Sequence, residues 1–259
     1  MYPLSTLLRA THDMVCSCML RTVAFIAYFF PLMASTTMLF IPLALVRLLG
    51  GVRAAGDFVR ILTGAWARHV LWVVGARVTV RSEGPAPRER VLCVVSNHQG
   101  FADIPVAVGY VPRKVGFIAK QELTRLPVLS WWMRAMDCVF LKRTSAQHAL
   151  RVIRRAVERM KGGRSMIVFP EGTRSRSRRM RSFKAGSMKL PKDAGAAVLP
   201  VTIDGTYRVF EEEGRIKPTE VSVTLHPVVP AETVGSLSRR ELAELLQQRI
   251  ARPLEGEGA

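Results

Sequence analysis

The chain has 259 residues, of which 38 are lysine or arginine and 20 are aspartate or glutamate, so its formal net charge is +18. Hydrophobic residues make up 49% of the sequence, and the mean hydropathy is positive. This apolar content excludes a disordered basic tail, which would be poor in hydrophobic residues. A chain that is both basic and apolar suits a protein that meets an anionic membrane surface. The length allows one large domain, or a domain of about 180 residues with an appendage.

The first expected element is an apolar segment near the N-terminus. Residues 22–46 contain no charged side chain and include Pro31 and Pro42. A helix of that length, rising about 1.5 Å per residue, reaches across a hydrocarbon core about 30 Å thick. The two prolines argue against a straight span. A secretory signal peptide is the alternative, but Arg47 follows the run where a small-residue cleavage site would be expected.

A second, amphipathic segment covers residues 57–78. Its apolar residues recur at helical spacing with arginines between them, which is the pattern of a helix that lies in a membrane interface. Gly50 and Gly51 separate the two segments and suit a turn. We therefore expect residues 1–75 to form a membrane-associated hairpin of two helices, which either spans the bilayer or embeds in it. Arginines flank the apolar run on both sides, so the positive-inside rule gives little asymmetry.

From about residue 77, short β-branched runs alternate with helical patterns, which predicts an α/β fold. We expect a mixed, mostly parallel sheet flanked by helices and preceded by the N-terminal two-helix segment. The expected strands are residues 77–81, 91–95, 115–119, 138–141, 166–169, 197–203 and 221–226. The clearest helix covers residues 145–161, with Ser145 as its N-cap and two glycines after its end. Another helix is expected over residues 238–250.

Polar residues follow the expected strand 91–95, and among them His98 and Asp103 stand five positions apart. Side chains at the end of a buried strand commonly point into a crevice in α/β folds. If Asp103 lies in the first turn of the next helix, its carboxylate can accept the proton of one imidazole nitrogen and leave the other nitrogen as a base. Spacing alone is a weak signal, because such pairs also occur by chance.

A second polar block follows the expected strand 166–169. Pro170 ends the strand and Gly172 permits a tight turn, so Glu171 and Arg174 are held close together on one loop. Arg174 can bind a phosphate through two parallel hydrogen bonds. The alternative is that Glu171 and Arg174 simply pair with each other at the surface.

Taken together, these blocks resemble the motifs of the glycerolipid acyltransferase family. The resemblance rests on Asn97 and His98, four intervening residues and Asp103, followed further along by Phe-Pro-Glu-Gly-Thr-Arg over residues 169–174. Further segments agree in the same order, at residues 117–123, 139–143, 183–186 and 198–203. The most similar members are the 1-acylglycerol-3-phosphate O-acyltransferases. Gly100 is a departure, because members often carry serine there, and this leaves a hydroxyl-dependent contact at that position in doubt.

The resemblance implies acyl transfer from acyl-coenzyme A or acyl carrier protein to the sn-2 hydroxyl of 1-acylglycerol-3-phosphate, giving phosphatidate in phospholipid biosynthesis. It implies that His98 is the general base, that Asp103 orients it, and that the hydroxyl attacks the thioester directly. The residues implied in acceptor binding are Lys120, Arg143, Glu171, Gly172, Thr173 and Arg174, with Arg174 on the phosphate. No bound cofactor and no metal are expected. The chain lacks a Gly-x-Ser-x-Gly elbow, which argues against a serine hydrolase.

The resemblance also implies an organisation and a location. Residues 1–75 would attach the protein to the membrane, 76–235 would form the acyltransferase domain, and 236–259 the C-terminal helix and tail. The expected partners are a lysophospholipid, an acyl thioester, an anionic membrane surface and, as a candidate, acyl carrier protein, with no nucleic acid. The active site is expected on the cytoplasmic face of the membrane. The four cysteines, which lack paired metal-ligand spacing, are expected to be free thiols.

Positive charge concentrates in residues 164–193, which hold nine basic and two acidic residues, a net charge of +7. Either this run binds lipid headgroups and substrate phosphates, or it is a solvated basic loop. Attraction to an anionic bilayer stabilises binding by about 1 kcal/mol per basic residue. Three roles stay open for Trp131 and Trp132: they line an acyl-chain tunnel, enter the membrane interface, or pack in the core.

Two other functions stay open at this point. One is acyl transfer to another lyso-lipid, such as lyso-ornithine lipid or another lysophospholipid. The other is a non-catalytic basic protein that binds membrane or nucleic acid. Against nucleic acid, no binding motif is evident, and aromatic residues make up only 7% of the chain.

Overall fold

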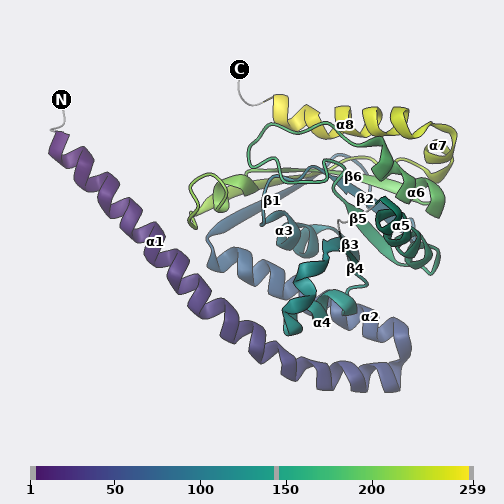
Figure 1. The fold of residues 1–259 in the computed structure, drawn as a ribbon, viewed down its shortest axis with the longest axis horizontal. Helices are drawn as coiled ribbons and strands as arrows, with labels where there is room; N and C mark the ends of the chain where they lie inside the picture. Colours follow the sequence, from purple (N-terminus) through teal and green to yellow (C-terminus); the bar gives the residue numbers. More distant parts are fainter. Residues whose placement is uncertain (1–3, 143–145, 257–259) are drawn as a thin grey trace.

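A sheet lies at the centre of the computed structural model, which describes residues 4–142 and 146–256 (Figure 1). Within these residues the sheet has seven strands, in the order β1-β7-β6-β2-β5-β3-β4. The strands are β1 Ala76–Ser82, β2 Leu92–Ser96, β3 Val115–Lys120, β4 Val139–Leu141, β5 Ser165–Val168, β6 Ala197–Asp204 and β7 Thr219–Leu225. Every strand expected from the sequence is present close to its predicted bounds.

The sheet is mixed and mostly parallel, as predicted. Strands β6, β2, β5, β3 and β4 run parallel to one another, whereas β7 is antiparallel to β6 and parallel to β1. The carboxyl ends of the five parallel strands therefore share one edge. Because β2 lies between β6 and β5, the loops that follow these three strands meet at that edge, which is where α/β sheets place their sites.

Helices cover both faces of the sheet, so the central strands are buried throughout. Leu92 and Val94 of β2 join a cluster with α2, α3 and α4 on one face, whereas Cys93 and Val95 join α5, α6 and α8 on the other. Beyond the N-terminal helices, the helices are α3 Asp103–Tyr110, α4 Pro127–Ala135, α5 Ala146–Lys161, α6 Lys189–Ala194, α7 Ala231–Ser236 and α8 Arg239–Glu255. Short 3-10 helices are η2 Gln121–Arg125, η3 Ala185–Met188 and η4 Thr206–Val209.

One predicted helix differs from the structure at its end. Helix α8 runs five residues beyond its predicted end at Ile250, as far as Glu255. Its start agrees with the prediction: Ser238 accepts a hydrogen bond from the Glu241 amide, and the Glu241 side chain accepts one from the Ser238 amide. For α5, the expected N-cap Ser145 lies outside the described residues.

The predicted N-terminal hairpin is present, but its first helix breaks early. Helix α1 covers Leu4–Ser35, the 3-10 helix η1 covers Thr36–Leu39, and α2 covers Phe40–Val73. The apolar run over residues 22–46 is therefore not one helix. The break follows Pro31 and coincides with three consecutive hydroxyl side chains, at residues 35–37, that donate to carbonyls three positions earlier at 2.6–2.8 Å.

The chain reverses direction within α2, at the predicted glycine pair. Gly51 has φ 75° and ψ −173°, which are not helical values, and Figure 1 shows the chain doubling back under the sheet in this part of α2. A positive φ of this size is readily accessible only to glycine. The sequence-based expectation of a turn here is confirmed.

The hairpin is docked on the rest of the protein. Val59 and Leu71 of α2 are buried in the same cluster as β2 and β6. The Thr22 hydroxyl of α1 accepts a hydrogen bond from the Ile216 amide at 2.9 Å, and the Thr36 hydroxyl accepts one from Trp132 Nε1 at 2.9 Å. The core thus extends across residue 75, and the division of the chain into residues 1–75, 76–235 and 236–259 stays a prediction.

The outward side of the hairpin is apolar. Exposed fractions reach 70% at Leu20, 79% at Leu48, 84% at Leu49 and 75% at Trp72. The stretch Cys18–Val73, alone in the described part of the chain, is long and apolar enough to cross a membrane by length and composition. Exposed apolar surface of this extent is typical of sites that contact a membrane or another protein.

His226 occupies a buried polar cluster that ties α8 to the sheet. Its Nδ1 lies 2.8 Å from Glu83 Oε2, and its Nε2 lies 2.8 Å from the Thr202 hydroxyl. Thr202 also donates to the Ile250 carbonyl at 2.8 Å, and Arg252 donates to Glu83 at 2.6 Å. Burial lowers the pKa of His226, and its hydrogen bond to Glu83 opposes that effect only in part.

We expect the protein to lose stability as the pH falls below about 6.5, because unfolded histidine titrates there and folded His226 has a lower pKa. In that window the unfolded chain binds more protons, so protonation favours unfolding. The melting temperature across this range measures the effect. The pH dependence should be weaker in His226→Gln, and an unchanged slope would contradict the assignment.

Candidate active site

His98 and Asp103 form a hydrogen-bonded pair at the carboxyl edge of the sheet. Asp103 is the first helical residue of α3, as the sequence predicted, and its Oδ2 lies 2.6 Å from His98 Nδ1. The Asp103 carboxylate is fully buried and also accepts hydrogen bonds from the Gly100 amide, at 2.9 Å, and from the Thr206 hydroxyl. An ionised carboxylate accepts from Nδ1–H, so the lone pair of the imidazole is on Nε2. The His98 side chain remains 18% exposed.

The residues on either side of His98 fix its loop to strand β6. Asn97 exchanges two hydrogen bonds with the backbone of Ile203, donating at 2.7 Å and accepting at 2.8 Å. Gln99 accepts a hydrogen bond from the Gly205 amide at 2.9 Å. The imidazole itself stacks on the Phe169 ring with centroids 4.3 Å apart. The ring is thereby held by a carboxylate at its edge and an aromatic side chain on its face.

Glu171 supports His98 through the backbone. It is 2% exposed, its Oε1 accepts the His98 amide at 2.7 Å, and its Oε2 accepts the Arg181 amide at 2.8 Å. Burial raises the pKa of Glu171, and the two amide hydrogen bonds oppose that rise. The alternative that Glu171 pairs with Arg174 is therefore wrong, because both carboxylate oxygens serve amides and Arg174 has another partner.

That partner of Arg174 is Glu211, in the segment after β6. Arg174 Nη1 donates to Glu211 Oε1 at 3.0 Å, and the guanidinium carbon lies 3.6 Å from the centroid of the Phe101 ring. The Arg174 side chain is 23% exposed. The cation is thus held between a carboxylate and an aromatic face, close to the loop that carries His98.

The other predicted binding residues have different surroundings. Gly172 has φ 72°, and a Cβ there would lie 2.9 Å from Lys184 Nζ, so the turn requires glycine. Thr173 is exposed beside it. Lys120 is exposed at the carboxyl end of β3, which β5 separates from β2. Arg143 lies outside the described residues.

Three residues at the site were missed by sequence reasoning: Gln99, Thr206 and Glu211. Gln99 stands next to His98, and its position after a buried strand was the only available signal. Thr206 and Glu211 contact the site from 103 to 110 positions away in the chain. Pattern within one sequence carries no information about such a contact, which depends on β6 lying beside β2.

The basic run over residues 164–193 carries less exposed charge than its count indicates. Five of its nine basic residues are engaged: Arg164 with Asp137, Arg174 with Glu211, Arg178 with Asp204, Lys189 with Asp193, and Lys192 with carbonyls at the end of α7. The remaining four are exposed: Arg176, Arg179, Arg181 and Lys184. The positive surface near the site is therefore smaller than net +7 predicts.

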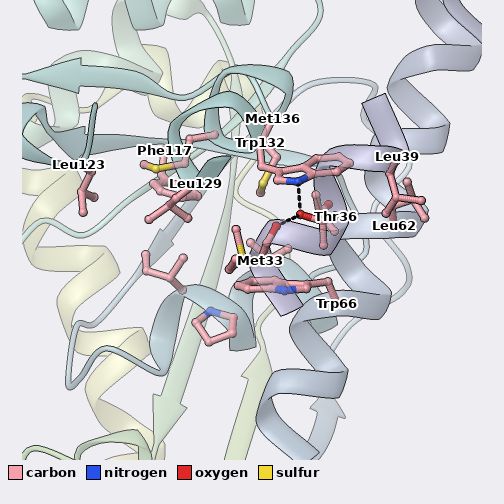
Figure 2. Close-up of a pocket in the computed structure, with 15 residues that line it drawn as sticks. Met33, Thr36, Leu39, Leu62, Trp66, Phe117, Leu123, Leu129, Trp132 and Met136 are labelled. Carbon is pink, nitrogen blue, oxygen red and sulfur yellow. Dashed lines mark hydrogen bonds between the residues drawn. The ribbon is translucent and has the colours of Figure 1, made fainter. Parts of the chain in front are cut away.

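An apolar cavity of 190 Å³ lies between the hairpin, α3 and α4 (Figure 2). Ile104 and Pro105, which follow Asp103 directly, form part of its wall. The opposite wall comes from the hairpin, including Met33, Leu39 and Trp66, and α4 contributes residues such as Trp132. Figure 2 shows the hydrogen bond between Trp132 and Thr36 that closes one side. Trp132 is therefore a wall residue, whereas its neighbour Trp131 is 48% exposed.

Comparison with known proteins agrees with this arrangement. The Acyltransferase family model matches residues 77–204, and the chain belongs to that family. The structure is similar to the crystal structure of the 1-acyl-sn-glycerophosphate acyltransferase PlsC from Thermotoga maritima, with a TM-score of 0.78 and 30% identity over 92% of this chain and 96% of that chain.

Two curated relatives extend the comparison. The 1-acyl-sn-glycerol-3-phosphate acyltransferase of Borreliella burgdorferi is 26% identical over 75% of this chain and 78% of its own. The lyso-ornithine lipid O-acyltransferase of Pseudomonas aeruginosa is 31% identical over 70% of this chain and 74% of its own. The chain spans only 43–52% of the length of three plant and algal relatives. Within its family, the chain is similar to several 1-acylglycerol-3-phosphate acyltransferases.

Glu171→Ala should lower kcat by about 10–100-fold, because each buried amide left without an acceptor costs about 1–3 kcal/mol and the His98 backbone loses its support. Initial rates and melting temperature, measured on the same preparation, separate catalysis from folding. Glu220→Ala, at an exposed carboxylate on β7, is the matched control. Equal rates for both variants would show that Glu171 does not position His98.

Proposed function

We propose that the protein transfers a fatty acyl group from an acyl thioester to the sn-2 hydroxyl of 1-acylglycerol-3-phosphate, giving phosphatidate. The observation that carries the proposal is the His98–Asp103 pair at 2.6 Å, with Arg174 held against Phe101 of the same loop and with Ile104 and Pro105, which follow Asp103, in the wall of an apolar cavity. A base, a site for phosphate and a space for a hydrocarbon chain are the elements that this reaction needs. The names of several relatives support this choice of acceptor.

In the proposed mechanism, His98 Nε2 removes the proton of the acceptor hydroxyl. The oxygen attacks the thioester carbonyl, the carbon–sulfur bond breaks, and the imidazolium returns the proton to the departing thiolate. Asp103 keeps Nδ1 protonated and stabilises the transient positive charge. A general base of this kind contributes about 10²–10⁴ in rate. No acyl-enzyme is formed, and no metal or bound cofactor takes part in the step.

The negative charge that develops on the thioester oxygen needs hydrogen-bond donors. The amides of His98, Gly100 and Phe101 are unsuitable, because they already donate to Glu171, Asp103 and Glu211. The donors must therefore come from outside these three amides of the catalytic loop. Positioning of the hydroxyl against the thioester supplies a further part of the rate enhancement.

Arg174 is the proposed ligand of the acceptor phosphate. Its guanidinium is partly exposed and its direction is fixed, which suits recognition of a phosphate group. The exposed cations of the same loop raise the local positive potential and attract anionic substrates. We propose Gly172, Thr173, Lys120 and Arg143 as further acceptor contacts from the family resemblance.

The apolar cavity is the proposed site for an acyl chain. A cavity of about 150 Å³ holds a benzene ring, so one of 190 Å³ accommodates several methylene groups. The donor is either acyl-coenzyme A or acyl carrier protein, and its phosphates or acidic side chains would meet the basic loop. A lysophospholipid and an acyl thioester are the substrates in both cases.

A second acceptor is favoured by one relative, the lyso-ornithine lipid O-acyltransferase. An ornithine headgroup carries an amine and no phosphate, so it would not use Arg174 in the same way. Purified protein offered lysophosphatidate, other lysophospholipids and lyso-ornithine lipid, with each thioester carrier, distinguishes these acceptors. Preferential acylation of lyso-ornithine lipid would overturn the proposed acceptor.

His98→Ala is expected to lower acyl transfer by about 10²–10⁴-fold, because the base is lost. Asp103→Asn should also be impaired, since an amide favours the wrong imidazole tautomer. Product formation from lysophosphatidate and co-sedimentation with anionic vesicles are measured together. Lost transfer with retained binding is the expected result, and unchanged transfer in His98→Ala would refute the base assignment.

We also propose that the hairpin embeds its outward face in the membrane and presents the basic active-site mouth to the cytoplasmic surface. The exposed leucines of α2 and the aromatic residues near the end of α2 support this placement. Cations around the mouth would then face anionic headgroups, which attract Lys and Arg by about 1 kcal/mol each.

Replacing Leu48 and Leu49 together with serine should weaken partition into anionic vesicles by about tenfold or more, because burying one leucine is worth about 1.5–3 kcal/mol. Point substitutions are preferable to deleting the hairpin, since α2 belongs to the core. The matched control is Leu150→Ser, at a leucine that is 46% exposed on α5. Equal partition of both variants would show that this turn of the hairpin does not insert.

A further inference from the structure

The backbone conformation at position 100 does not explain why this residue is glycine. It is not among the glycines with positive φ, so its conformation is open to other residues. A Cβ at Gly100 would, however, lie 2.5 Å from Glu211 Oε2, 3.0 Å from Glu211 Cδ and 3.1 Å from the Thr206 carbonyl oxygen. The Glu211 carboxyl group occupies the volume in which a side chain at position 100 would stand.

The Glu211 carboxyl group is almost completely enclosed. Its side chain is 3% exposed, and its Oε1 accepts hydrogen bonds from the Phe101 amide at 2.7 Å and from Arg174 at 3.0 Å. Its Oε2 is buried and has no hydrogen-bond partner within the described part of the chain. Burial raises the pKa of Glu211, and the Phe101 amide and Arg174 oppose that rise. A carboxylate is kept in this costly position although nothing in the sheet requires it.

The Glu211 carboxylate and the Phe101 ring contact Arg174 from two directions. Phe210 contacts the Phe101 ring edge to face, with centroids 6.1 Å apart, and Phe101 in turn covers the guanidinium. The Arg174 side chain is long and flexible by itself, so an unsupported guanidinium at a partly open mouth would sample many rotamers. The carboxylate and the ring restrict it to one direction.

Two consecutive amides connect this clamp to the catalytic pair. The Gly100 amide donates to Asp103, and the Phe101 amide donates to Glu211. The peptide between these two residues therefore sets the distance between the carboxylate that orients His98 and the carboxylate that orients Arg174. A shift of Glu211 would move the cation relative to the base.

We propose that Glu211 is a positioning residue for the acceptor, which fixes the Arg174 guanidinium at a set distance from His98. Because Gly100 has no side chain, it leaves room for the Glu211 carboxyl group. The inference rests on the proposed function, because it takes the acceptor phosphate as the ligand of Arg174. Glu211 acts through Arg174 and does not itself touch the reacting atoms. A phosphate bound at Arg174 then places the acceptor hydroxyl at Nε2 of His98.

The first test compares steady-state kinetics of Glu211→Ala, Glu211→Gln and Glu212→Ala, with lysophosphatidate and acyl-coenzyme A as the probes. Glu211→Ala should raise the KM for lysophosphatidate by about tenfold, lower kcat, and leave the KM for acyl-coenzyme A unchanged, because the acceptor is bound less tightly and its hydroxyl is placed less well. Glu211→Gln keeps an oxygen for Phe101 and Arg174, so it should restore most of the affinity. Glu212 is exposed next to Glu211, and its variant should behave as wild type.

The second test enlarges the side chain at position 100 and then removes the Glu211 carboxyl group. Gly100→Ser alone should be strongly impaired, because its side chain collides with the carboxylate. Adding Glu211→Ala removes the collision, so the double variant should be more active than Gly100→Ser. Such non-additivity is the signature of residues in direct contact.

The proposal is overturned if Glu211→Ala changes the lysophosphatidate KM by less than twofold, or if both KM values change together. It is also overturned if the double variant is no better than Gly100→Ser. Arg174→Ala separates this proposal from the proposed function. A raised lysophosphatidate KM in Arg174→Ala without one in Glu211→Ala refutes only the role of Glu211. An unchanged KM in Arg174→Ala refutes the phosphate site, and with it both proposals.

Discussion

The loop between β2 and α3 depends on carboxylates that capture its amides. Asp103 stands at the end of the loop itself, whereas Glu171 and Glu211 come from distant parts of the chain. Glu171, Asp103 and Glu211 accept the amides of His98, Gly100 and Phe101, respectively. The backbone amides of this short loop are thus held by buried carboxylates, whereas amides in a sheet are held by carbonyls of the neighbouring strand. Every other feature of the site takes its position from this arrangement, including the imidazole and the cation beside it.

The sheet brings these acids together. Because β2 lies between β5 and β6, the turn that carries Glu171 and the segment that carries Glu211 both reach the β2 loop. Burial raises the pKa of both glutamates, and amide hydrogen bonds oppose the rise in each case. The site thus uses costly buried charge to hold geometry, which is typical of places where function and stability compete.

Much of the fold could be predicted from the sequence, because β-branched runs, glycine turns and capping residues are local signals. The turn at Gly51, the capping box at Ser238 and the position of Asp103 all depend on nearby residues. The His98–Asp103 pair could be predicted for the same reason. The partner of Arg174 was not, since Glu211 lies 37 positions away in a segment without a motif. The prolines indicated that the apolar run would not be straight, but the exact end of α1 was not predicted; it coincides with the successive hydroxyl groups at residues 35–37.

The contact between Thr36 and Trp132 joins the two walls of the apolar cavity. One wall belongs to the hairpin and the other to helix α4, so the depth of the cavity is a property of how these parts seat against each other. In the proposed function, the acyl chain would lie in a space that is bounded on one side by the hairpin proposed to embed in the membrane. Selection among chains of different length would therefore respond to the lipid around the hairpin as well as to the residues that line the cavity.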